Sequence, residues 1–117
     1  MRALVVEDEM LVRILTEDAL AELGYQVAAS VASLNEALRC IEQVAFDFAV
    51  LDINLAGATS FPAAELLLGK SIPFLFVTGY GARGVPAEWR KYPIVQKPYA
   101  SEQLRDAIGN ILRPVQS

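Results

Sequence analysis

Short apolar runs alternate with amphipathic stretches along the whole chain. The first, Ala3-Leu-Val-Val6, is a continuous apolar run typical of a strand buried on both faces, and five segments in all predict β-strands. They cover residues 3–6, 25–31, 46–51, 72–77 and 94–96. Most of the stretches between them repeat their apolar residues at helical spacing. Strands that alternate with helices in this way predict right-handed βαβ crossovers and a parallel sheet.

The first two predicted helices can be located from their ends. The first follows a cap at Asp8 or Glu9 and ends at Gly24, where a helix C-terminal glycine belongs. Its apolar side is formed by Leu11, Ile14, Leu15, Ala19 and Leu23. The second helix starts at the capping box Ser33-Leu-Asn-Glu36 and runs to about Val44.

The later part of the chain predicts two more helices and one weak segment. One helix covers roughly residues 60–68, and the last begins at a cap at Ser101 and ends before Pro114. The apolar side of the last helix is formed by Leu104, Ile108, Ile111 and Leu112. Residues 79–86 contain three glycines and a proline, so a fourth helix between the last two strands is expected to be short or poorly ordered.

These elements predict one α/β domain over residues 1–117 with a flavodoxin-like, three-layer fold. Its five-stranded parallel sheet is expected to have the order 2-1-3-4-5. The first strand is followed by an acidic turn instead of Gly-x-Gly-x-x-Gly, which argues against dinucleotide binding.

Composition narrows the possible functions. A hydrophobic content of 54% suits a packed core, and a net charge of −4 argues against nucleic acid as a direct partner. No apolar run approaches the ~18 residues of a membrane span. Cys40 is the only cysteine, and the first strand starts next to Met1, so we expect a cytoplasmic protein without a signal peptide. The absence of histidine excludes imidazole zinc ligands and a histidine phosphocarrier role.

Polar residues follow four of the predicted strands. Glu7-Asp8-Glu9 comes after the first strand, Asp52 after the third, Thr78 after the fourth and Lys97 after the fifth. The carboxyl ends of parallel strands meet at one edge of the sheet, so we expect these side chains to face one crevice. A lysine and several carboxylates there indicate phosphoryl chemistry with a divalent metal.

The carboxylates suit a magnesium site. Carboxylates about 4–6 Å apart repel one another by roughly 3–4 kcal/mol at an effective dielectric constant near 20, and a hard cation removes that cost. Asp52 follows a rigid apolar strand and is the candidate nucleophile, because a carboxylate can take a phosphoryl group as an acyl phosphate. The backbone carbonyl of Asn54 offers the metal another oxygen. The alternatives are that the acidic turn only caps the first helix and that Asp52 only caps a loop.

Thr78 and Lys97 would face the phosphoryl group from the other side of the crevice. The hydroxyl can donate a hydrogen bond, and the ammonium can pair with phosphoryl oxygens. A plain Thr-Gly turn and a solvated lysine are the alternatives. Pro98 fixes the backbone next to Lys97 and makes the Lys97–Pro98 bond a candidate for the cis form.

Taken together, Glu7-Asp8, Asp52, Thr78 and Lys97-Pro98 resemble the receiver domain of two-component response regulators. The separations of 44, 26 and 19 residues between Asp8, Asp52, Thr78 and Lys97 fit that family, and the resemblance covers essentially the whole chain.

The resemblance implies a role for each residue. Asp52 would accept a phosphoryl group from a phosphohistidine of a partner histidine kinase or histidine phosphotransfer protein. Asp8, Asp52 and the Asn54 carbonyl would bind Mg²⁺, with Glu7 assisting through water. Thr78 and Lys97 would contact the phosphoryl group. Such a domain is not an enzyme in its own right, because it assists only its own phosphorylation and dephosphorylation.

Two positions modify this expectation. Ile94 stands where many receivers carry an aromatic switch residue, so we expect the glycine-rich segment after Thr78 to respond to phosphorylation instead. Tyr80 lies two residues after Thr78, where a bulky ring would slow loss of the phosphoryl group. The segment around Thr78-Gly-Tyr80 also resembles a single-domain receiver subgroup marked by Phe-x-x-Thr-Gly-Tyr.

Two other functions remain open on the sequence. A Mg²⁺-dependent aspartyl phosphohydrolase would need a second aspartate two residues after Asp52, where this chain has Asn54. A phosphorylation-independent adaptor would not need the whole set of site residues. By the same resemblance, a downstream protein target or a second copy of the chain would bind the face formed by the fourth helix, the fifth strand and the fifth helix.

Overall fold

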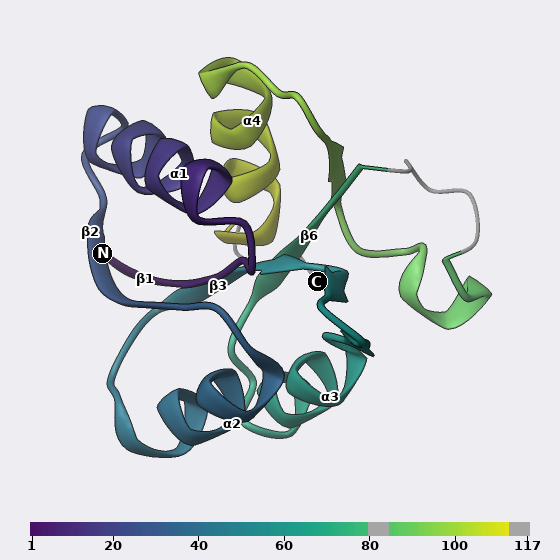
Figure 1. The fold of residues 1–117 in the computed structure, drawn as a ribbon. Helices are drawn as coiled ribbons and strands as arrows, with labels where there is room; N and C mark the ends of the chain where they lie inside the picture. The colour runs from purple at the N-terminus through teal and green to yellow at the C-terminus, as the bar shows by residue number, and fades with distance from the viewer. Residues whose placement is uncertain (80–84, 113–117) are drawn as a thin grey trace, which may run out of the picture.

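The computed structural model describes residues 1–79 and 85–112 as an α/β fold of three layers (Figure 1). The central sheet has five parallel strands: β1 (Arg2–Val6), β2 (Gln26–Val31), β3 (Phe48–Asp52), β6 (Phe74–Thr78) and β7 (Ile94–Gln96). Their order is β2-β1-β3-β6-β7. Numbered along the sheet strands alone, this is 2-1-3-4-5, so the predicted fold and strand order are confirmed.

Two pairs of helices cover the sheet. In Figure 1, α1 (Met10–Glu22) and α4 (Ser101–Leu112) lie on one face, and α2 (Leu34–Gln43) and α3 (Phe61–Gly69) lie on the other. Each pair closes its own hydrophobic cluster against the sheet, because alternate residues of the buried strands point to opposite faces. The two clusters make the sheet a rigid support for residues at its edge.

Two predicted helix ends are confirmed. Gly24 has φ +91° after α1, and the Tyr25 amide donates to the carbonyl of Leu20 at 2.9 Å, as in a Schellman motif. At the start of α2, Ser33 Oγ accepts a hydrogen bond from the Glu36 amide at 3.2 Å. These local signals were sufficient because each involves only residues within one helical turn.

Two other predicted caps were wrong. Glu9 occupies the position before α1, but its side chain makes no capping hydrogen bond, and Asp8 binds a different part of the chain. Ser101 is the first residue of α4 instead of its cap. The Ala100 amide donates to Gln103 Oε1 at 2.8 Å. The side chain of a glutamine therefore accepts the hydrogen bond of a backbone amide at the start of this helix. The predicted helix end at Pro114 lies outside the described residues.

The predicted apolar side of α1 was also largely wrong. Leu11, Ile14 and Leu15 are 69%, 45% and 58% exposed. The buried residues of α1 are Thr16, Ala19 and Leu20. The Thr16 hydroxyl donates to the Val12 carbonyl at 2.9 Å, so a residue that the hydropathy pattern treats as polar is satisfied within the packed face. Helix α1 therefore has an apolar side that is exposed to solvent.

A small hairpin after β3 was not predicted. Strand β4 (Asn54–Leu55) pairs with β5 (Ala58–Thr59), and Gly57 takes φ +83° in the turn between them. A residue with a side chain is strained at that φ, which explains the glycine. Strands of two residues are too short to show a hydrophobic periodicity, so this hairpin could not be predicted from the pattern.

The segment between β6 and β7 contains one short helical turn among its described residues, the 3₁₀ helix η1 (Ala87–Trp89). Trp89 is buried and stacks on Phe61 of α3, with ring centroids 5.5 Å apart and planes 2° apart. The expectation of a short fourth helix therefore holds for residues 85–93. Tyr80 lies outside the described residues.

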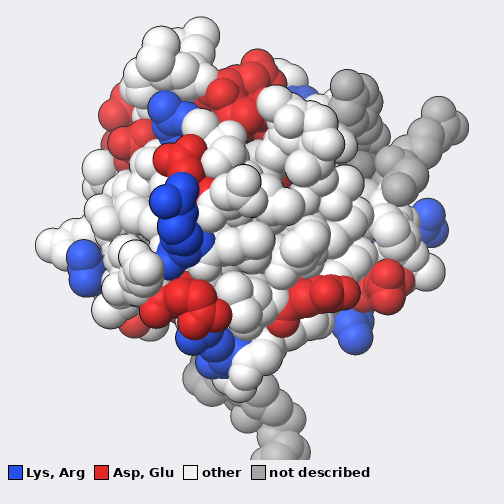
Figure 2. All heavy atoms as spheres, turned by 60° about the horizontal axis from the view of Figure 1, so that its bottom comes forward, with Lys and Arg blue, Asp and Glu red and all other residues white. Residues whose placement is uncertain are grey.

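On the face seen in Figure 2, Lys and Arg side chains lie among Asp and Glu and form no continuous basic area. An ion pair joins Lys70 Nζ, at the end of α3, to Glu42 Oε2 of α2 at 3.4 Å. In the described part of the chain, no helix has the length and apolar character required to cross a membrane.

Candidate functional site

Strand ends bring the predicted residues to one edge of the sheet. Glu7 directly follows β1, and its amide extends the ladder to the carbonyl of Val31 at 3.0 Å. Asp52 is the last residue of β3 and Thr78 the last of β6. The Lys97 amide donates to the Thr78 carbonyl at 2.8 Å, which fixes the backbone just after β7. The predicted convergence of these positions is therefore present in the fold.

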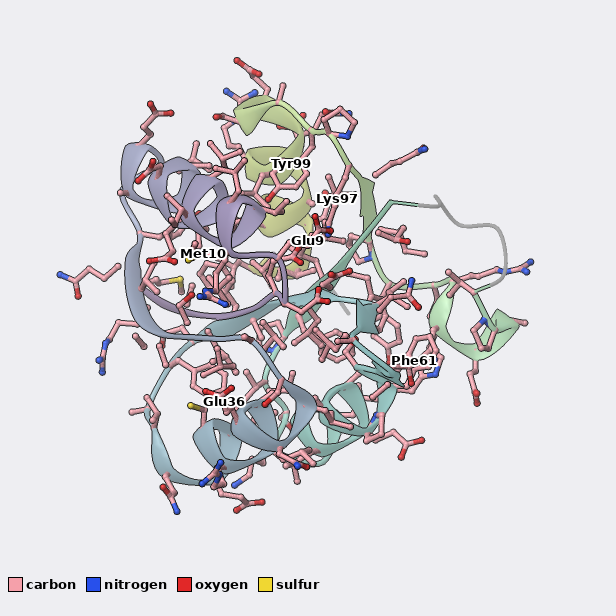
Figure 3. The ribbon with its side chains drawn as sticks, in the orientation of Figure 1. Glu9, Met10, Glu36, Phe61, Lys97 and Tyr99 are labelled. Atoms are coloured by element: carbon pink, nitrogen blue, oxygen red, sulfur yellow. The ribbon has the colours of Figure 1, made fainter. Side chains whose placement is uncertain are left out.

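Lys97 connects the carboxylates of the site. Its Nζ lies 2.6 Å from Glu7 Oε1 and 3.2 Å from Asp52 Oδ2. Its side chain is 15% exposed, so these ion pairs are largely shielded from water. Figure 3 shows Lys97 reaching from the end of β7 into the middle of the molecule, with Glu9 beside it. The alternative of a solvated lysine does not describe this residue.

Charge and burial compete at Lys97 and Asp52. Burial acts to lower the pKa of Lys97, but the carboxylates of Glu7 and Asp52 outweigh it and hold that pKa above its usual value. Burial, together with the neighbouring Glu7, raises the pKa of Asp52 to about 7, and Lys97 offsets only part of this effect. The site therefore holds one more buried negative charge than its single ammonium can balance.

Asp8 is bound by the hairpin. Its Oδ2 accepts a hydrogen bond from the Ala56 amide at 3.1 Å. Burial acts to raise the pKa of Asp8, but hydrogen bonds, that from Ala56 first, hold it below its usual value. The Asn54 amide donates to Asp52 Oδ1 at 3.3 Å. Both aspartates thus contact amides of the β4 side of the hairpin.

The same edge of the hairpin orients the Asn54 carbonyl. Ile53 and Ser60 are hydrogen-bonded across the hairpin at 2.9 Å, and Asn54 is the next residue, opposite Thr59. In an antiparallel ladder such neighbouring positions alternate between pointing across the pair and pointing away from it. Since the Asn54 amide points to Asp52, its carbonyl points to the same outer side. This geometry agrees with a carbonyl ligand at the acidic site.

The donor set fits a hard divalent cation. Glu7, Asp8 and Asp52 each offer one carboxylate oxygen, and these oxygens lie within 4.8 Å of one another. All ligands are oxygens, which suits Mg²⁺ better than a softer metal. A cation would also relieve the excess negative charge beside Asp52. The residues present therefore fit the metal that the sequence suggested.

A pocket of about 660 Å³ opens in front of these carboxylates. It is lined by Asp8, Asp52, Lys97, Gly79 and hairpin residues 54–59, with Glu9 at its border. A groove of about 470 Å³ runs from Glu9 and Lys97 along α1, past Leu15 and Tyr99. The site is therefore open to a reacting group and continuous with the exposed apolar side of α1.

Thr78 and Ile94 occupy distinct environments. Thr78 is 2% exposed at the end of β6, and the pocket lining includes its neighbour Gly79. Ile94 pairs with Phe76 across β6 and β7 and packs against the cluster that α2 and α3 cover. Ile94 is half-buried. It occupies the position at which many receivers carry an aromatic switch residue.

Sequence reasoning missed two contacts of the site. Glu9 was expected at the crevice as part of the acidic turn, but its ion pair with Lys97, with Oε1 3.7 Å from Nζ, was not predicted. Ala56 was not among the predicted site residues, although its amide donates a hydrogen bond to Asp8. Gly57 was the one residue that could have indicated a hairpin here. The hydrogen bond to Asp8 comes from a backbone amide, so no particular side chain in the sequence could have predicted it.

Comparison with known proteins identifies the family. A profile of the response regulator receiver domain matches residues 3–109. The chain belongs to the receiver-domain family of two-component response regulators. Receiver domains are signalling domains, and they generally bind Mg²⁺ at an acidic pocket of this kind.

Individual relatives agree with this assignment. The two-component response regulator PhoP of Pseudomonas aeruginosa is 35% identical over 120 aligned positions, which cover 97% of this chain and 52% of PhoP. The chain thus spans about half the length of this relative. The solution structure of SdrG from Sphingomonas melonis Fr1 is similar with a TM-score of 0.87, 35% identity and 97% coverage of both chains.

A second structure, of the BeF3-activated conformation of SdrG from Pseudomonas melonis Fr1, is similar with a TM-score of 0.85. Its identity is 35%, with 96% of both chains covered. One detail of the subgroup motif was wrong. The position three before Thr78 is Leu75, and the phenylalanines are its neighbours Phe74 and Phe76.

Proposed function

We propose that this receiver domain, spanning residues 1–117, is a Mg²⁺-dependent phosphoacceptor and that Asp52 takes the phosphoryl group. The observation that carries the proposal is the pairing of Lys97 Nζ with both Asp52, at 3.2 Å, and Glu7, at 2.6 Å, beside an open pocket. A buried nucleophile, an ammonium and a set of oxygen ligands are the groups that in-line phosphoryl transfer requires.

In the proposed reaction, a carboxylate oxygen of Asp52 attacks phosphorus and the phosphorus–nitrogen bond of a phosphohistidine breaks. The electron pair stays on the imidazole nitrogen of the donor, which leaves as the partner protein's neutral histidine after protonation. Lys97 and Thr78 would hold the phosphoryl oxygens. Asp8, Asp52 and the Asn54 carbonyl would hold Mg²⁺, with Glu7 assisting through water. When bound there, Mg²⁺ would supply positive charge that offsets the negative charge of the phosphoryl group.

The donor must be another protein, because this chain has no histidine. Met10, Leu11, Ile14 and Leu15 leave one side of α1 exposed and apolar, and the groove beside α1 leads directly to Lys97. Exposed apolar residues next to a reactive pocket favour docking of the kinase or phosphotransfer protein at α1. Output would follow by protein contact through the face of β7 and α4, either with a downstream target or with a second copy.

A phosphorylation-independent adaptor remains the alternative, since a receiver fold can bind partners without chemistry. The site argues against it, because a carboxylate whose pKa is raised to about 7 by burial is costly to keep without a chemical role. An aspartyl phosphohydrolase is less well supported, since Asn54 cannot act as its general acid.

Incubation with phosphoramidate, a small phosphodonor, distinguishes these functions. Intact-protein mass spectrometry should show one added phosphoryl group that requires Mg²⁺ and is absent from Asp52→Asn. Asp106→Asn, the same substitution at a residue whose side chain is 70% exposed on α4, is a matched control and should still be labelled. A wild-type protein that binds Mg²⁺ but is never labelled would favour the adaptor.

A further inference from the structure

A buried hydrogen bond ties the loop after Lys97 to α1. Tyr99 lies in the connection between β7 and α4, two residues after Lys97. Its hydroxyl contacts the Thr16 hydroxyl of α1. Figure 3 shows Tyr99 between α1 and α4, next to Lys97. The two residues are 83 positions apart, so the contact exists only in the folded chain.

The direction of this hydrogen bond is determined by its neighbours. Thr16 has one hydroxyl proton, which it donates to the Val12 carbonyl at 2.9 Å. Tyr99 must therefore be the donor to Thr16. Thr16 is 3% exposed, so water cannot readily replace the tyrosine. A buried hydroxyl that loses its partner is costly, which favours retention of the contact.

The pair holds the segment that carries the reactive ammonium. The Lys97 backbone is fixed on one side by the Thr78 carbonyl at 2.8 Å. Pro98 is exposed and has no amide proton, so the next side chain that anchors the loop is Tyr99. Lys97 has four flexible methylenes, and its ammonium reaches Glu7 and Asp52 only if the loop keeps its position.

We propose that Tyr99 and Thr16 are positioning residues that hold Lys97 in place for phosphorylation of Asp52. The inference rests on the proposed function, because it assigns these residues a role in the same reaction. They touch neither the phosphoryl group nor the metal. Their hydrogen bond fixes the loop between α1 and the end of β7, and the loop fixes the direction of the ammonium.

Tyrosine-to-phenylalanine variants test this directly. Tyr99→Phe removes the donor, and Tyr25→Phe is the matched control. Both rings pack against the same hydrophobic cluster, but within the described residues the Tyr25 hydroxyl has no hydrogen-bond partner. The maximal rate of phosphorylation by phosphoramidate at saturating Mg²⁺ should fall about fivefold or more in Tyr99→Phe. A reacting group that is misplaced by about 1 Å can lower a reaction rate on the order of 100-fold. Tyr25→Phe should remain within about twofold of the wild type, as expected for a change that leaves the positioning contact intact.

Thr16 variants separate positioning from general stability. Thr16→Val should lower the maximal rate as Tyr99→Phe does, Thr16→Ser should preserve it, and the double variant should lose no more than either single variant. Mg²⁺ affinity, measured by calorimetry, should not fall, since neither residue contacts a metal ligand and a displaced ammonium competes less with the cation for Glu7 and Asp52. The resonance of the Lys97 ammonium in nuclear magnetic resonance spectra should broaden or disappear in both single variants.

Equal rates for Tyr99→Phe and Tyr25→Phe would overturn the inference, as would a parallel loss of rate and Mg²⁺ affinity. A wild-type protein that cannot be phosphorylated would instead remove the proposed function itself. The ammonium resonance is measured without any phosphodonor, so the positioning contact is tested even in that case.

Discussion

Replacing Asp52 by asparagine should make the metal-free protein more stable. Asp52 is 4% exposed and lies beside Glu7, and these surroundings raise its pKa from 3.8 to about 7. The asparagine has nearly the same shape but carries no charge. The substitution therefore removes the cost of a buried carboxylate and leaves the packing of β3 unchanged.

The size and pH dependence of the gain follow from the pKa. Below about pH 4 the carboxyl is protonated in both the folded and the unfolded chain, so the gain is near zero. Between about pH 4 and pH 7 the unfolded chain releases the proton while the folded chain keeps it, and wild-type stability falls. Above pH 7 the cost is constant. A rise from 3.8 to about 7 corresponds to about 4 kcal/mol at 1.36 kcal/mol per pH unit.

Urea unfolding at pH 5 and at pH 8 measures this difference. Asp52→Asn should exceed the wild type by about 2–4 kcal/mol at pH 8 and by less at pH 5. Asp106→Asn is the control, because the Asp106 side chain is 70% exposed, and its effect should stay within about 0.5 kcal/mol. A gain below about 1 kcal/mol at pH 8, or one equal at both pH values, would refute this account of Asp52.

Three further substitutions test other parts of the structure. Asp8→Asn should lower Mg²⁺ affinity at least tenfold by calorimetry, since a metal ligand loses its charge; unchanged affinity would place the cation elsewhere. Leu15→Ser should slow phosphotransfer from a histidine kinase that phosphorylates the wild type, whereas Leu68→Ser, on α3, should not; equal rates would argue against docking at α1. Phe61→Leu should lower the free energy of unfolding by about 1–2 kcal/mol and shift the fluorescence of Trp89, because it removes the ring that stacks on Trp89. An unchanged unfolding free energy would show that this stacking does not stabilise the fold.

The sequence predicted the sheet and the strand-end residues because both depend on short, strong signals. Largely apolar segments marked all five strands, and the residues after them had to meet at one edge. The Ser33 cap and the Gly24 helix end were predicted for the same reason: the partners lie within one turn. Helix caps failed where a carboxylate had a better partner elsewhere, as Asp8 has in the Ala56 amide.

Contacts between distant segments could not be predicted from the sequence. Helix α1 carries two apolar stripes, and hydropathy selected the one with more leucine and isoleucine. The fold buries the stripe that contains Thr16, because Val12 and Tyr99 satisfy its hydroxyl. A single sequence cannot show that a tyrosine near one end of the chain meets a threonine near the other.

The most direct test of the central claim is to map the phosphorylated residue. After treatment with phosphoramidate and Mg²⁺, borohydride reduces an aspartyl phosphate to homoserine, and peptide mass spectrometry locates the change. We expect homoserine at position 52 alone, and none when the metal is chelated. A modification at Asp8 or Glu7 instead, or one at position 52 that forms equally well without Mg²⁺, would contradict it.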